Sequence, residues 1–167
     1  MITTTLAQIR AYDPCRDGWR RILRGLNKNT ADTEELTVGR IADVASMPDA
    51  LWALQSVRDQ DQALRRLALL SYRLVRHNCS SAVDHIVLNA EFNINEIADW
   101  DTSKAYEAAI ACSATESDHI AAVALHPDAR WAARASATKA LQGKAVRWIK
   151  QGGVLVDYRE MLIRGAL

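Results

Sequence analysis

The segment from Tyr12 to Trp19 constrains the fold most, because it predicts where the first long helix begins. An aspartate such as Asp13 can accept hydrogen bonds from the free N–H groups of a first turn, and Pro14 suits the first helical position. Apolar side chains then follow with the i, i+4, i+7, i+8 and i+11 spacing of one buried helix face: Cys15, Trp19, Ile22, Leu23 and Leu26. Gly25 and Asn27 predict the end of this helix. We therefore expect a helix over 14–26 with Cys15 packed on its buried face.

The composition favours helices along the whole chain. Only 7 glycines and 3 prolines occur in 167 residues, which is few for a turn-rich β-sandwich, and 49% of the residues are hydrophobic. A chain of this length can bury one core of ordinary size, whereas two full domains would be cramped. The prediction is an all-α fold: a compact multi-helix bundle of eight or nine helices in a single domain over 1–167, in which any sub-division would fall near 79–101.

Capping residues and helical spacing place the individual helices. We expect helices after the following segments: Thr3–Thr5, Thr37, Ser46–Asp49, Asp59–Asp61, Ser80 or Ser81, Asp101–Ser103, Ser117–Asp118 and Pro127–Asp128. The β-branched residues near 38–45 leave a strand open as an alternative there. We predict a turn at 93–95 and one more helical turn over 97–100. The helix from 127 is expected to be the longest and to end at Gly152–Gly153, before a last helix over 154–167.

Two segments share a pattern in which acidic residues precede arginines and alanines. These segments are 59–68 and 127–135, and the pattern resembles the second helix of HEAT-type repeats. The resemblance implies stacked helix pairs, each covering the apolar face of the next. Ordinary helix capping produces the same pattern, so a bundle without repeats remains the alternative.

The charges are strongly segregated, although the net charge is only +1. Residues 79–128 carry one basic and nine acidic side chains, whereas 1–28 and 129–167 have net charges of +4 and +6. Either the acidic and basic helices pack side by side and neutralise each other, or one block faces a charged partner.

No feature predicts export or a membrane span. Residues 1–5 lack the basic and apolar regions of a signal peptide, and no window approaches 18 uninterrupted apolar residues. The cysteines Cys15, Cys79 and Cys112 are odd in number and far apart. We therefore expect reduced, buried thiols in a cytoplasmic protein.

No spacing of residues predicts a catalytic or metal site. No two histidines lie three or four residues apart, and no Cys-x-x-Cys motif occurs, so we expect neither a metal nor a cofactor. An exposed Cys15 beside Arg16 would be a candidate nucleophile, but its place on the apolar face predicts a packed thiol. Neither a Gly-x-Ser-x-Gly motif nor a glycine-rich phosphate loop is present. An enzyme whose site is assembled from scattered residues is the remaining alternative.

Two sets of charged residues are candidates for binding. The acidic set would bind a basic partner, for example by occupying a nucleic-acid channel: Glu91, Glu96, Asp99, Asp101, Glu107, Glu116 and Asp118. The basic set would bind phosphates of a nucleic acid if the first and the longest helix lay side by side: Arg16, Arg20, Arg21, Arg24, Lys139, Lys144, Arg147 and Lys150.

Two segments resemble a group of small uncharacterised proteins of phages and prophages. They are Asp13-Pro14-Cys15-x-x-Gly18-Trp19 and Asp49-Ala50-Leu51-Trp52-Ala53-Leu54-x-x-Val57, within about the first 60 residues. The group has no assigned activity, so the resemblance implies only a setting inside bacterial cells. Our hypothesis is a non-enzymatic phage or mobile-element protein that binds a host protein or nucleoprotein complex, for example to inhibit a defence system such as CRISPR. Homo-oligomers are compatible with this hypothesis.

Overall fold

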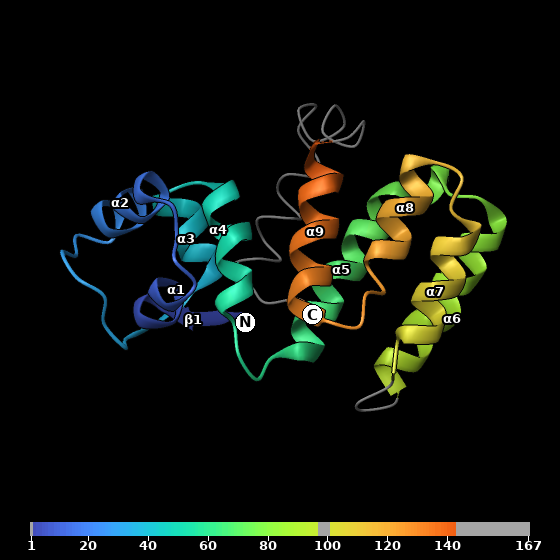
Figure 1. Cartoon of the computed structure of the whole chain (residues 1–167), viewed down its shortest axis with the longest axis horizontal. Helices are drawn as coiled ribbons and strands as arrows, with labels where there is room; N and C mark the ends of the chain where they lie inside the picture. Colours follow the sequence, from blue (N-terminus) through green and yellow to red (C-terminus); the bar gives the residue numbers. More distant parts are fainter. Residues whose placement is uncertain (1, 97–100, 143–167) are drawn as a thin grey trace.

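The computed structural model describes residues 2–96 and 101–142 and shows an all-α fold, as predicted (Figure 1). Within these residues the only sheet has two short strands. The elements in chain order are β1 (Thr3–Thr5), α1 (Leu6–Ala11), α2 (Arg16–Gly25), β2 (Glu35–Thr37), α3 (Val38–Val44), α4 (Met47–Ala53), η1 (Leu54–Ser56), α5 (Asp61–Val75), η2 (Arg76–Asn78), α6 (Ser81–Glu96), α7 (Ser103–Cys112), α8 (Glu116–Val123) and α9 (Ala129–Gln142).

The two-stranded sheet is a feature that the sequence did not predict. β1 pairs antiparallel with β2, and Thr4 lies opposite Leu36. The other edge of β1 is closed by the side-chain amide of Gln60, which donates to the Thr3 carbonyl and accepts from the Thr3 N–H, both at 3.0 Å. Thr5 ends the strand and caps α1 in a capping box with Gln8, as its place in the chain predicted.

The start of α2 differs from the prediction. Asp13 has a φ of 50°, and the N-cap is Cys15, whose sulfur accepts a hydrogen bond from the Gly18 N–H at 3.4 Å. Cys15 is exposed, so the expected packed thiol is wrong. The physical reason is that a capping side chain turns back toward the first turn and cannot also lie on the helix face. On that face Ile22 is buried and Trp19 is partly buried.

The end of α2 was predicted correctly, and the structure shows why. Asn27 adopts a φ of 54°, and the N–H of Lys28 donates to the Leu23 carbonyl at 2.9 Å, which is a Schellman motif. Gly25 serves a different purpose, because a Cβ at this position would lie 2.3 Å from the carbonyl oxygen of Val44. Only glycine allows α2 to approach α3 this closely.

Thr37 and Ser46 cap α3 and α4 as predicted, but two other boundaries differ. α6 continues through the expected turn at 93–95: the side-chain amide of Asn93 donates to the Asn89 carbonyl one turn earlier, and the burial of Ile94 holds this end of the helix against the core. α8 is capped by Thr115, in a capping box with Asp118, rather than by 117–118. The predicted turn at 97–100, the helix end at 152–153 and the last helix over 154–167 lie outside the described residues.

One hydrophobic cluster extends from Ile2 to Ala137 and connects all parts of the described chain. In Figure 1, α1 to α4 form one end of the molecule, α9 and α5 lie in the middle, and α8, α7 and α6 form the other end. The two segments with the shared acid–arginine pattern begin α5 and α9, and these helices pack against each other. Because three helices separate α5 and α9 along the chain, they are not consecutive units of a repeat stack.

No helix in the described part of the chain combines the length and the apolar composition that crossing a membrane requires.

Candidate functional site

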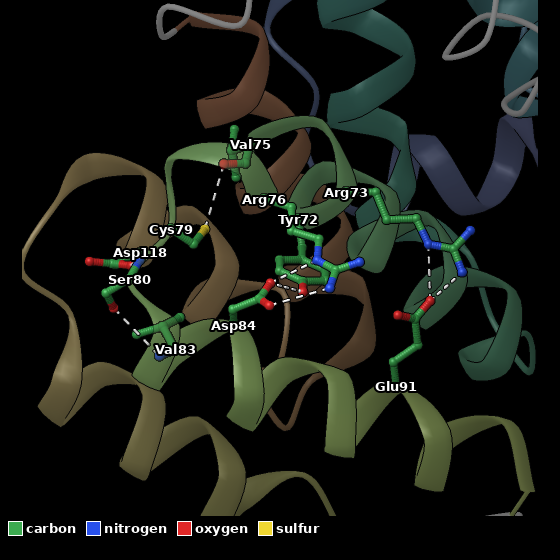
Figure 2. A network of polar contacts seen from close by, with 10 residues as sticks. All are labelled: Tyr72, Arg73, Val75, Arg76, Cys79, Ser80, Val83, Asp84, Glu91 and Asp118. Atoms are coloured by element: carbon green, nitrogen blue, oxygen red, sulfur yellow. Dashed lines mark hydrogen bonds and ion pairs between the residues drawn. The ribbon is translucent and has the colours of Figure 1, made fainter.

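A network of polar side chains joins α5 and η2 to α6 (Figure 2). The hydroxyl of the buried Tyr72 donates to Asp84, and the Arg76 Nε donates to the same carboxylate at 2.8 Å. Two helical turns further along α6, Glu91 accepts a hydrogen bond from the Arg73 Nε at 3.0 Å. Because Asp84 and Glu91 are seven residues apart, both lie on the same side of α6, and the two contacts fix the rotation of this helix about its axis.

The ionisation states of this network follow from its surroundings. Burial, and then the hydrogen bond to Asp84, raise the pKa of the Tyr72 hydroxyl, so it remains a proton donor at neutral pH. The hydrogen bonds from Arg76 and Tyr72 lower the pKa of Asp84. The carboxylate is therefore charged and the phenol is neutral, which is the combination that this hydrogen bond requires.

The fixed rotation of α6 leaves two large apolar side chains in solvent. Leu88 is 36% exposed, and Phe92, the only phenylalanine of the chain, is 65% exposed. They are four residues apart, so they are neighbours along the helix, whereas Val83, Val87 and Ala90 point into the core. Single exposed apolar residues are common, but two adjacent ones on a helix that is fixed in place are a candidate contact surface.

In the ion pairs beside these residues, the arginine side chains are more exposed than the carboxylates. The side chain of Arg73 is 59% exposed but that of its partner Glu91 only 13%, and the corresponding values for Arg76 and Asp84 are 49% and 25%. Leu88 follows Asp84 by four residues and precedes Glu91 by three, so it is a neighbour on the helix of both carboxylates that bind the arginines. We call Arg73, Arg76, Leu88 and Phe92 the α6 face: an apolar centre with an arginine rim.

The structure places the acidic residues predicted from the sequence in different environments. Asp118 is fully buried and accepts hydrogen bonds from the Ser80 N–H at 2.7 Å and the Ala114 and Thr115 N–H groups at 3.2 Å. Burial alone would raise the pKa of Asp118, but these N–H groups hold it below its usual range. Asp118 is thus a structural residue and not a partner contact.

The other acidic residues do not form one patch of free carboxylates. Glu91 is engaged by Arg73, as described above, and Asp101 accepts a hydrogen bond from the Ser103 N–H at 2.9 Å while remaining exposed. Glu107 and Glu116 are exposed. The side chain of Glu96, and Asp99, lie outside the described part of the structure.

The basic set is also divided. Arg16, Arg20 and Arg24 are exposed on α2, but Arg21 forms an ion pair with Asp49 at 2.8 Å. Lys139 on α9 is partly buried. The condition stated for this set, that the two helices lie side by side, is not met in the described residues, because α3 and α4 lie between α2 and α9 (Figure 1). The remaining members, Lys144, Arg147 and Lys150, lie outside the described residues.

The cysteines and histidines do not gather into a site in the described residues. No group of three His, Cys, Asp or Glu side chains there is placed to hold a metal ion. Cys15 and Cys112 are exposed rather than buried as expected. Cys79 is partly buried, and this burial raises the pKa of its thiol to about 11, so the thiol is protonated at neutral pH.

The α6 face was not among the sites predicted from the sequence, although one signal was available. Leu88 and Phe92 lie off the stripe formed by Val83, Val87 and Ala90, and a helical projection places them on the opposite side of the helix. Comparisons with models of protein families, with curated proteins and with solved structures give no match to this chain.

Proposed function

We propose that this chain is a binding protein rather than an enzyme, and that it contacts a partner protein through the α6 face. The observation that carries the proposal is the exposure of Phe92 and Leu88 on a helix whose orientation two ion pairs fix. An aromatic side chain on an ordered helix has only two rotatable bonds, so it loses little entropy when it enters a pocket, and such residues dominate the energy of many interfaces.

The α6 face also indicates the chemistry of the partner. Its centre is apolar and the charges that protrude around it belong to Arg73 and Arg76. A complementary surface would therefore offer an apolar pocket for Phe92 with carboxylates at its border. This differs from the acidic surface that the sequence suggested, because on this face the carboxylates are the more covered members of each pair.

We further propose that the partner is a host protein or a protein within a host nucleoprotein complex, such as a CRISPR defence complex. The support is the resemblance of the first part of the chain to phage and prophage proteins. In the structure Asp49 of the second segment lies close to Gly18 of the first and also binds Arg21, which follows the first segment.

The test compares three forms of the protein as bait in a bacterial host lysate: wild type, Phe92→Ser and Asn89→Ser. Asn89 is exposed on the same helix, so its substitution is a matched control. We expect wild type and Asn89→Ser to retain the same stoichiometric protein and Phe92→Ser to lose it. With that protein purified, calorimetry should show a loss of about 2 kcal/mol in binding free energy for Phe92→Ser, roughly 30-fold in Kd.

A substitution in the arginine rim of the α6 face tests the proposal independently, with the same purified partner. Arg73→Gln should slow association and reduce the dependence of the association rate on salt, with a smaller effect on dissociation. A partner that all three baits retain equally, or an Arg73→Gln variant with unchanged salt dependence, would contradict the proposal.

A further inference from the structure

A second surface, far from the α6 face, brings together arginine and aromatic side chains from the two ends of the described chain. The guanidinium carbon of Arg10 lies 5.8 Å from the ring centroid of Trp19. Two residues after Arg10, the Tyr12 hydroxyl accepts a hydrogen bond from the Nη1 of Arg130 at 3.3 Å. Residues separated by 118 positions thus meet at the start of α9, at the lower end of that helix in Figure 1.

The aromatic members of this surface are available to a ligand. Trp131 is 43% exposed and Tyr12 is 37% exposed, and both flank Arg130. One face of Trp131 is supported from within by His126, whose ring centroid lies 4.2 Å away, and His126 in turn contacts the ring of Tyr106. Trp131 is therefore held in position while part of its ring remains open to solvent.

Further basic side chains lie on α2, the helix that carries Trp19. Arg16, Arg20 and Arg24 recur every four residues on its exposed side, about 6 Å apart along the axis, and no described residue forms an ion pair with them. Arg21, by contrast, is held by Asp49. We call Arg10, Tyr12, Trp19, Arg20, Arg130 and Trp131 the Arg–aromatic strip.

We propose that the Arg–aromatic strip binds a single-stranded nucleic acid, with the arginines on phosphates and with Tyr12 and Trp131 stacked on bases. Aromatic rings interleaved with arginines suit single strands, because unpaired bases can stack while the backbone follows the positive groups. In a duplex the bases already stack on one another, so exposed rings add nothing and only the phosphate contacts remain.

Acidic groups beside the Arg–aromatic strip limit its expected affinity for a single-stranded nucleic acid. The Asp128 carboxylate caps α9, because it accepts hydrogen bonds from the N–H groups of Arg130 and Trp131 at 2.8 and 3.0 Å. It also forms an ion pair with the Arg130 Nε at 3.6 Å, with which a phosphate would compete. Asp17 is exposed in the first turn of α2, next to the arginine row. Replacing it by asparagine should therefore tighten binding, by about two- to three-fold at low salt.

The experiment measures fluorescence anisotropy of labelled oligonucleotides of about 15 residues, as oligo-dT, oligo-rU and a DNA duplex, at about 50 mM salt. Wild type should bind the single strands more tightly than the duplex, and the two single strands show whether the sugar matters. Arg20→Gln/Arg130→Gln should weaken binding about ten-fold or more. The matched control Arg40→Gln/Arg58→Gln removes two other exposed arginines and should weaken it less than three-fold, by roughly the general effect of charge.

Stacking is tested separately with Trp131→Leu, which should weaken binding of single strands about five-fold or more and leave duplex binding unchanged. If circular dichroism shows that this variant is unfolded, Tyr12→Leu takes its place. The proposal is overturned if no single strand binds at low salt, if both double variants lose affinity equally, or if the duplex binds as tightly as the single strands. Retention of an acidic protein instead of any oligonucleotide would also overturn it.

Discussion

Two joints in this molecule use the same chemistry, an arginine bound to an aspartate on another helix, but in different surroundings. In the first joint, between α2 and α4, the nearly buried Asp49 accepts hydrogen bonds from the Arg21 Nε and Nη2 at 2.9 and 2.8 Å and from the Ser46 hydroxyl at 2.6 Å. In the second, between η2 and α6, Asp84 binds Arg76 and Tyr72 at the border of the open α6 face.

The difference shows how one type of contact can have two consequences. At the first joint the aspartate is the covered partner, because the Asp49 side chain is only 10% exposed whereas that of Arg21 is 50% exposed. A Cβ on Gly18 would lie 2.9 Å from the Asp49 carboxylate. Little space is left for another molecule, so changes there should appear as changes in stability. At the second joint Arg76 is as exposed as Arg21, but the Asp84 side chain is more open, at 25%, and lies one helical turn before the exposed Leu88, so changes there should appear mainly in binding.

The largest expected effect is on the close approach of α2 to α3. In Gly25→Ala the added methyl group would overlap the Val44 carbonyl oxygen at 2.3 Å, and backbone cannot move aside as a flexible side chain can. We expect a loss of about 3 kcal/mol in the free energy of unfolding, measured by urea denaturation. Gly18→Ala meets side-chain atoms instead and should cost clearly less. If Gly25→Ala costs no more than Gly18→Ala, the close approach of α2 to the backbone of α3 is contradicted.

The next effect concerns the covered joint itself. The covered Asp49 carboxylate accepts three side-chain hydrogen bonds, and Asp49→Asn replaces one of its oxygens by an NH2 group that cannot accept, so the substitution should cost about 2 kcal/mol. Burial would raise the pKa of Asp49, but Arg21 and Ser46 hold it below its usual range. Its stabilising contribution is therefore present above the unfolded-state pKa and is lost as the pH falls through the lower folded-state pKa. Denaturation between about pH 5 and 3 should show a smaller loss of stability in the variant than in wild type.

The smallest effect on stability is expected at the open joint. Asp84→Asn retains an oxygen that can accept the Tyr72 hydrogen bond, and the exposed Arg76 can be hydrated, so the cost should be about 1 kcal/mol or less. The same variant should weaken binding of the purified partner, because the rotation of α6 is held less firmly. A stability loss as large as that of Asp49→Asn would remove the contrast between the joints.

Much of the fold could be predicted from local sequence signals. Thr37, Ser46 and Asn27 act at helix ends as their chemistry predicts, because a cap depends only on residues within one turn. The predictions failed where a residue had two possible roles. Cys15 fits both an apolar stripe and a cap, and the chain uses it as the cap.

The candidate sites could not be predicted from short segments, because they depend on contacts between residues far apart in the sequence. The acidic and basic sets were chosen by charge, yet Asp118 is buried and Arg21 is paired, because each meets N–H groups or a carboxylate from another part of the chain. The same holds for Tyr12 and Arg130, which are neighbours only in the folded protein.

The sequence alone determined that this chain folds into helices and where most of them begin, because helix periodicity and capping are properties of short segments. The tertiary structure alone decided which charged side chains are paired or buried and which remain free on the surface. Asp84 and Glu91 are engaged because Arg76 and Arg73 reach them from η2 and α5, and no signal within a short segment contains these contacts.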